Sequence, residues 1–136
     1  MSNEYGFGCQ LALPFAEAIS AVTAALKQEG FGVLTEIDVK ATLKAKIGVD
    51  YRPYVILGAC NPNLAYRGLQ AEPDLGLLLP CNVIVYDSGN GASAVSIVDP
   101  LQMLGFVGNP ALQPIADEAN ARLRRVIGNL SGQPAA

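Results

Sequence analysis

The sequence predicts a two-layer α+β domain, in which helices pack on one face of a mainly antiparallel β-sheet. Half of the 136 residues (51%) are apolar, which suits one compact core. Apolar residues alternate or run together in five segments and recur at three and four in others, which indicates strands and helices respectively. A short glycine-rich turn joins the last two strands and favours a hairpin. The expected order is β-α-β-(short α)-β-(short α)-β-β-α within a single domain, residues 1–136.

The first part of the chain predicts strand, helix and strand. Residues 5–13 place their larger apolar side chains at every second position, which puts Cys9 on the core face of a strand. Pro14 suits the first turn of a helix that Gly30 ends. Residues 31–37 alternate again and predict the second strand. Cys9 is therefore expected to serve packing, as a small hydrophobe.

A short helix is expected to follow this strand. Asp38 is a suitable N-cap and Gly48 a suitable end. Lys40, Lys44 and Lys46 form the one basic cluster of the sequence. Because charge runs on helices usually face water, we interpret the cluster as a solvated helix face and not as an anion site.

The central strand is expected at residues 54–59, which are apolar on both faces. It stops at Cys60. Asn61 is a good N-cap and Pro62 a good first helical residue, so residues 63–70 are expected to form a short helix.

A hairpin is expected next. Residues 77–87 read as a strand, although Pro80 cannot donate to a ladder and implies an edge, a bulge or a late start. Residues 88–91 form the turn, and residues 93–98 return as the partner strand. Asp99-Pro100 ends that strand.

The C-terminal part predicts one long helix. Residues 101–108 are expected to form a loop that covers the sheet. From Leu112, apolar residues follow helical spacing as far as Leu130. Residues 131–136 are expected to fray, since nothing in them can be buried.

Composition excludes several functional classes. The formal charge of -3, with nine basic residues, argues against a nucleic-acid partner. The absence of histidine removes the commonest general base and zinc ligand, so no recognisable catalytic constellation remains. Three cysteines at wide spacing do not form a disulfide framework, and neither a signal peptide nor a membrane-spanning run is apparent. A reducing cytoplasm is the expected location.

The candidate site is a pair of cysteines at strand ends. Cys60 precedes a predicted helix N-terminus, where the peptide dipoles favour a thiolate, so Cys60 is expected to be the more nucleophilic thiol. Cys81 repeats the Cys-Asn pair with Asn82. If the two strands are antiparallel neighbours, the sulfurs can approach; if they are parallel, the thiols lie at opposite edges. Each thiol alone is also an ordinary core residue.

Met103 adds a thioether to the two thiols of the candidate site. Two thiolates and a thioether suit a soft ion such as Cu(I). A methionine between Leu101 and Leu104 also fits as gap-filling core. No other cofactor is expected.

Several sequence blocks stand out together: Gly30-Phe31 with Val33-Leu34, Glu36-Ile37-Asp38, residues 57–62, residues 78–83, and Asp99-Pro100 with Met103. As a set they resemble the signature blocks of domain-of-unknown-function family 302. The resemblance covers nearly the whole chain and implies a small α+β fold similar to the TATA-box-binding-protein class, often as a homodimer and without DNA binding. The family carries no established activity. Cys9 does not coincide with its signature positions, whereas Cys60, Asn61, Pro62, Pro80, Cys81, Asp99 and Met103 do.

Three functional hypotheses follow. The first is a cytoplasmic protein with a thiol site at Cys60 and Cys81, supported by Asn61, Pro62, Asn82 and Asp99, that acts in thiol redox, sulfur handling or soft-ligand binding. The second is a homodimeric binding module without catalysis, in which the cysteines are structural. The third is a soft-metal site formed by Cys60, Cys81 and Met103. In each case we expect no nucleic acid and no membrane partner.

Overall fold

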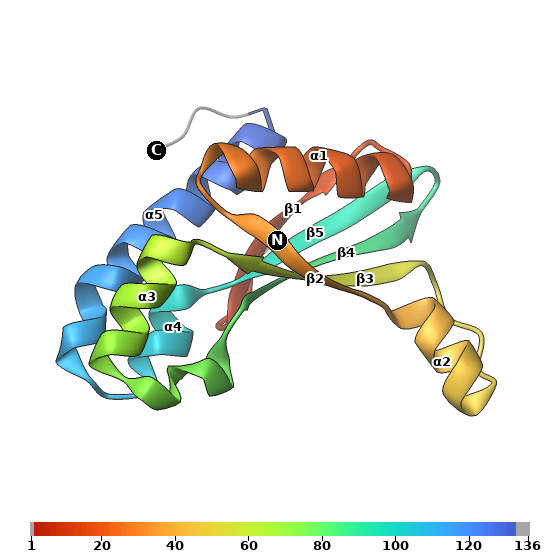
Figure 1. Cartoon of the computed structure of the whole chain (residues 1–136). Coiled ribbons are helices and arrows are strands. Elements are labelled where there is room, and N and C mark those ends of the chain that lie inside the picture. Colours follow the sequence, from red (N-terminus) through yellow and green to blue (C-terminus); the bar gives the residue numbers. More distant parts are fainter. Residues whose placement is uncertain (1, 133–136) are drawn as a thin grey trace.

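A computed structural model describes residues 2–132, which form a five-stranded sheet with helices (Figure 1). The strand order is β1-β5-β4-β3-β2, and every neighbouring pair is antiparallel. The predicted two-layer α+β class, with its antiparallel sheet, is therefore confirmed. The strands are β1 (Gly6–Leu11), β2 (Gly32–Asp38), β3 (Tyr54–Cys60), β4 (Cys81–Gly89) and β5 (Ala92–Val98).

The helices fall into three groups. Helices α1 and α5 contact each other and the sheet, whereas α3 and α4 pack on α5 at one end of the sheet. Helix α2 stands apart beyond the other end (Figure 1). The helices are α1 (Phe15–Gln28), α2 (Val39–Ile47), α3 (Pro62–Ala71), α4 (Pro100–Gly105) and α5 (Gln113–Leu130), with 3-10 turns η1 (Pro73–Leu78) and η2 (Pro110–Leu112).

The core lies between one face of the sheet and helices α1 and α5. Alternate residues of the strands face it, and the helices contribute residues at spacings of three and four. This burial is the main source of stability, at about 25 cal/mol for each Å² of apolar surface removed from water. The largest side chains sealed in it include Val22, Leu26, Leu57, Val83, Val85, Val95, Ile97, Leu123 and Val126.

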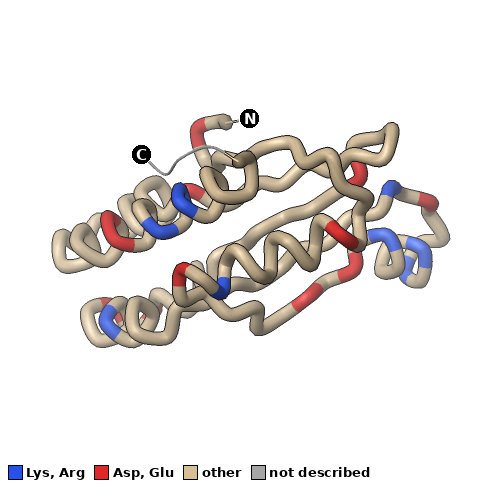
Figure 2. Tube along the Cα trace, turned by 90° about the horizontal axis from the view of Figure 1, so that it is seen from above, with Lys and Arg blue, Asp and Glu red and all other residues tan. Residues whose placement is uncertain are grey.

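Polar caps fix where α2 and α3 begin, as predicted. The backbone N–H of Ala41 donates to Asp38 Oδ1 at 2.9 Å, which satisfies an otherwise unpaired donor of α2. Gly48 ends α2 with a φ of 68°, a left-handed conformation that favours glycine. The lysines of α2 gather on this projecting helix (Figure 2), none of whose residues is buried.

The loop predicted for residues 101–108 is wrong in its first half, which is helix α4. Asp99 is the N-cap, since the Leu101 N–H donates to its Oδ1 at 2.8 Å, and Pro100 occupies the first turn. Pro100 and Leu104 are buried against the core. Gly105 is the last residue of the helix and Gly108 lies beyond it, so neither glycine interrupts α4.

The predicted start of the fourth strand is also wrong. Strand β4 begins at Cys81 and not at Leu77, because Pro80 ends the preceding irregular segment and residues 73–78 form a 3-10 turn. The Leu77 side chain is 87% exposed, so the apolar run that suggested a strand is not buried as one. The hairpin turn is centred on Asn90 and Gly91, which both have positive φ, as a tight hairpin requires.

Of two residues expected on the core face at the first strand, one packs against the core and the other does not. Cys9 is half-buried and packs against the core, as predicted. Tyr5 precedes β1 and is 71% exposed, so its expected place on the core face is wrong.

The frayed tail predicted for residues 131–136 lies, from residue 133, outside the described residues. Within residues 2–132, no helix is long and apolar enough to span a membrane.

Candidate functional site

Cys60 lies where strand β3 leaves the sheet. It is the last residue of β3, and Asn61 and Pro62 directly afterwards start helix α3. The Leu64 N–H donates to Asn61 Oδ1 at 3.2 Å, and the Asn61 side chain is largely buried. This cap holds the turn, and so it fixes the direction in which the Cys60 thiol leaves the strand.

Cys81 begins the neighbouring strand at the same end of the sheet. Strands β3 and β4 are antiparallel, and Cys81 lies directly opposite Ala59, the residue before Cys60. Strand geometry then separates the Cys60 and Cys81 Cα atoms by about 6 Å, with the two Cβ atoms directed toward opposite faces of the sheet. Of the two arrangements left open by the sequence, the structure has the antiparallel one, which brings both cysteines to the same end of the sheet. Both cysteines are free.

One small cavity is bordered by both cysteine residues and by Met103. Its volume of about 40 Å³ exceeds the 10–15 Å³, roughly, that one water molecule needs. It lies between the end of the sheet and helices α3, α4 and α5. The lining contains almost no polar surface apart from Asn61, and its other members are Phe31, Ala59, Leu64, Ala65, Leu75, Leu79, Pro80, Pro100, Leu104, Ile115 and Ala119.

Burial keeps both thiols protonated. It raises the pKa of Cys60, and it raises that of Cys81 to about 11, with the charge on a Cys60 thiolate as the second cause. Cys60 therefore ionises first. Burial opposes the expected effect of the helix N-terminus on the pKa of Cys60, and the expectation that Cys60 is the more nucleophilic of the two thiols stays a prediction.

Of the supporting residues proposed from the sequence, Asp99 and Pro62 belong to the first turns of helices beside the cavity, whereas Asn82 lies away from it. Asp99 does not line the cavity, but it caps α4, which carries Met103, and its Oδ2 lies 3.7 Å from Arg124 Nη2. Pro62 shapes the first turn of α3. Asn82 lies on the other face of the sheet, since it alternates with the core residue Val83, so the repeated Cys-Asn pair does not form one site.

Other residues of the cavity were not identified from the sequence. Ile115 and Ala119 of α5 close it, and their helical spacing predicted burial but not their position beside the thiols. Among residues 2–132, no three His, Cys, Asp or Glu side chains are grouped to hold a metal ion. A metal ion at the cysteine pair would therefore take a third protein ligand of another type, and Met103 is the soft donor at hand.

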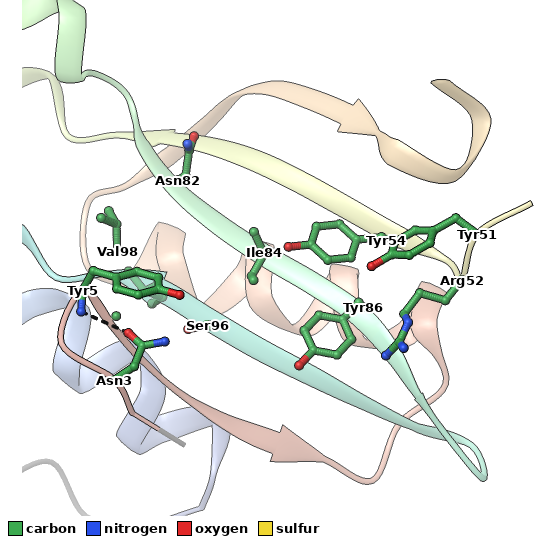
Figure 3. Close-up of a pocket in the computed structure, with 12 residues that line it drawn as sticks. Asn3, Tyr5, Tyr51, Arg52, Tyr54, Asn82, Ile84, Tyr86, Ser96 and Val98 are labelled. Atoms are coloured by element: carbon green, nitrogen blue, oxygen red, sulfur yellow. Dashed lines mark hydrogen bonds between the residues drawn. The ribbon is translucent and has the colours of Figure 1, made fainter. Parts of the chain in front are cut away.

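A second hollow lies on the opposite face of the sheet (Figure 3). Tyr54 and Tyr86 alternate with the core residues Val55 and Val85, so they point away from helices α1 and α5. The sequence Tyr51-Arg52-Pro53-Tyr54, which joins α2 to β3, is the signal that could have indicated this surface.

Fold and cavity together define a small α+β protein with two free thiols at one end of an antiparallel sheet. The chain belongs to the family described as Domain of unknown function DUF302, whose model matches residues 7–130. It is similar to an uncharacterized conserved DUF302 protein from Bacillus stearothermophilus, known from a crystal structure, with 33% sequence identity and a TM-score of 0.84. That match covers 94% of this chain and 99% of the other. No curated protein matches the chain.

Proposed function

We propose that this protein binds a soft metal ion of the Cu(I) type through the sulfur atoms of Cys60, Cys81 and Met103. The observation that carries the proposal is that three sulfur-containing residues from β3, β4 and α4 border one apolar cavity. Thiolates and thioethers select soft ions, and a chain without histidine offers no imidazole alternative.

The electrostatics of the cavity suit a cation. Two thiolates in this apolar lining would lack solvation and would also repel each other, and these two effects, in that order, raise the pKa of Cys81 to about 11. A monovalent cation between the sulfurs offsets one of the two charges and is bound as the thiol protons leave. A reducing compartment such as the cytoplasm belongs to the proposal, since it keeps both the thiols and Cu(I) reduced.

Thiol redox chemistry and sulfur handling are less well supported by the same geometry. A nucleophilic cysteine needs a lowered pKa and access to its substrate. Here burial raises both pKa values, and Cys81 is only 8% exposed. We therefore expect Cys60 to react with an alkylating reagent no faster than an unactivated thiol.

The test is an anaerobic titration of Cu(I) against a coloured chelator of known affinity. We expect one ion per chain. Cys60→Ala and Cys81→Ala should each weaken binding at least about 100-fold, the upper end of what loss of a supporting residue costs at metal sites, and Met103→Leu about tenfold. Cys9→Ala is the matched control, because Cys9 lies outside the cavity, and it should bind like the parent protein. Equal affinity in all four variants would contradict the proposal.

A second candidate function is that of a homodimeric interaction module, and a different surface favours it. Strand β2 is an edge strand, and Leu34 and Ile37 on it are 67% and 48% exposed. Helix α2 follows directly, with Ile47 at 67% exposed. Contiguous exposed apolar surface and unpaired strand edges are typical of protein interfaces. We propose that two copies meet through β2 and α2.

Analytical ultracentrifugation over a concentration series tests this dimer. Leu34→Lys combined with Ile47→Glu should shift the protein to monomer, because each places a charge in the proposed contact. Leu77→Lys is the control, since Leu77 is 87% exposed on η1, away from this surface, and it should leave the dimer intact. A parent protein that is monomeric at the highest concentration would rule the dimer out.

A further inference from the structure

The hollow on the outer face of the sheet has a volume of about 620 Å³, within the range of small-molecule sites (Figure 3). Four of the five tyrosines of the chain line it, namely Tyr5, Tyr51, Tyr54 and Tyr86, together with Arg52. The thiol cavity shares none of its lining residues with this hollow. The two are separate features on opposite faces of one sheet.

Two glycines at the start of strand β1 leave that part of this face without side chains, and Gln10 is the first residue of β1 to carry one there. Gly6 and Gly8 alternate with the core-facing Phe7 and Cys9. A Cβ atom at Gly8 would lie 1.9 Å from the Val95 carbonyl oxygen of β5, so only glycine fits there. Because the two backbones approach closely, the sheet face at these glycines carries no side chains. The tyrosine side chains lie next to this part of the face.

The aromatic wall is ordered by the sheet register. Tyr54 and Tyr86 are directly opposite each other on β3 and β4, and their rings stack at a centroid distance of 5.4 Å with an interplanar angle of 7°. Tyr51 adds a tilted ring 6.1 Å from Tyr54. None of the four tyrosine hydroxyls of the hollow hydrogen-bonds to another residue in the described part of the chain, so all four can donate to a ligand.

Arg52 supplies the charge of the hollow. Its Cζ atom lies 5.5 Å from the centre of the Tyr86 ring and 5.8 Å from that of Tyr51, so the two rings hold the guanidinium in place. Each of the other four arginines forms an ion pair with a carboxylate. Within residues 2–132, Arg52 has no carboxylate at ion-pair distance. The N–H groups of its guanidinium therefore remain available to a ligand.

We infer that this hollow binds a planar aromatic molecule that carries an anionic group, a carboxylate or a phosphate. The anion pairs with the Arg52 fork, which matches both groups in geometry, and the ring packs on Tyr54 and Tyr86. The tyrosine hydroxyls hydrogen-bond to the polar edge of the ligand. A neutral ring lacks the ion pair, and an aliphatic anion lacks the stacking.

Protein-observed NMR titration tests this inference with four probes. 2-Naphthoate and 2-naphthyl phosphate carry the required ring and distinguish a carboxylate from a phosphate. 2-Naphthylmethanol has the same ring without charge, and cyclohexanecarboxylate has the charge without an aromatic ring. We expect the side-chain signals of Tyr54, Tyr86 and Arg52 to move with one or both aromatic anions, and both other probes to bind about tenfold more weakly.

Three variants locate the binding. Arg52→Gln should weaken the aromatic anion about tenfold, and Tyr86→Leu by a similar factor, with circular dichroism to verify the fold. Tyr66→Leu is the control, because Tyr66 is 65% exposed on α3 and lies outside the hollow. No signal movement at millimolar probe, equal binding of the neutral ring, or unchanged binding in Arg52→Gln would overturn the inference. So would protection of the four tyrosines by a second copy in solution.

Discussion

Raising the pH should destabilise this protein through Cys81. The pKa of its thiol is raised from 9.0 to about 11 in the folded chain, mainly because the side chain is buried. Above pH 9 the unfolded chain loses this proton while the folded chain keeps it, so ionisation favours unfolding. The contribution of Cys81 to the free energy of unfolding is therefore complete below pH 9 and is lost as the pH rises toward 11.

The size of the effect follows from the two pKa values. Their difference is worth about 2.7 kcal/mol at the high-pH limit. At pH 10.5, where the folded thiol is still mostly protonated, the loss is about 1.9 kcal/mol. Cys81→Ala removes this dependence but leaves a gap in the core, which costs about 1 kcal/mol at every pH, as for one buried methyl-sized group. The order of stability of parent and variant should therefore reverse between pH 8 and pH 10.5.

Urea unfolding at pH 8, 9, 10 and 10.5 under reducing conditions measures this reversal. Only the difference between parent and variant is interpreted, because the raised pKa values of Cys9, Tyr54 and Cys60 affect both proteins alike. Two stability curves that stay parallel over this range would show that the folded Cys81 thiol ionises as it does in the unfolded chain. The account of an apolar thiol cavity would then be wrong.

Two further predictions concern the elements that hold the two sites. Gly8→Ala should cost about 3 kcal/mol or more in chemical denaturation, because the added Cβ would meet the Val95 carbonyl oxygen, whereas Gly76→Ala, where a Cβ meets nothing within 4 Å, should be close to neutral; equal stability of the two variants would contradict this. Asn61→Ala should cost about 1–2 kcal/mol by removing the cap of α3, and Asn61→Ser should recover most of that loss, whereas a serine variant as unstable as alanine would show that the cap is not the cause.

Much of the fold follows from local patterns. Alternation gave the strands, and the caps at Asp38 and Asn61 marked where α2 and α3 begin, because these signals depend on only a few neighbouring residues. Helix α4 has the same cap-proline signal at Asp99-Pro100, but its six residues are too few for a helical period to show. The apolar residues 77–79 misled for the opposite reason, since they resemble a strand and yet lie in a turn.

The site depended on information that a single sequence does not contain. The position of Cys60 beside Cys81 follows from the pairing of β3 with β4, and the spacing of 21 residues suits parallel and antiparallel arrangements equally. Likewise, the free charge of Arg52 is a property of the assembled surface, because it depends on which carboxylates the fold brings near. Residue types indicated the chemistry, and the register of the sheet determined which residues meet.

X-ray absorption spectroscopy of the Cu(I)-loaded protein tests the central claim most directly, because it counts the atoms bound to the metal and identifies their type. The account predicts three sulfur neighbours and no nitrogen or oxygen, falling to two in Met103→Leu. A first shell of nitrogen or oxygen atoms, or a spectrum that Cys60→Ala and Cys81→Ala leave unchanged, would contradict a metal site built from Cys60, Cys81 and Met103.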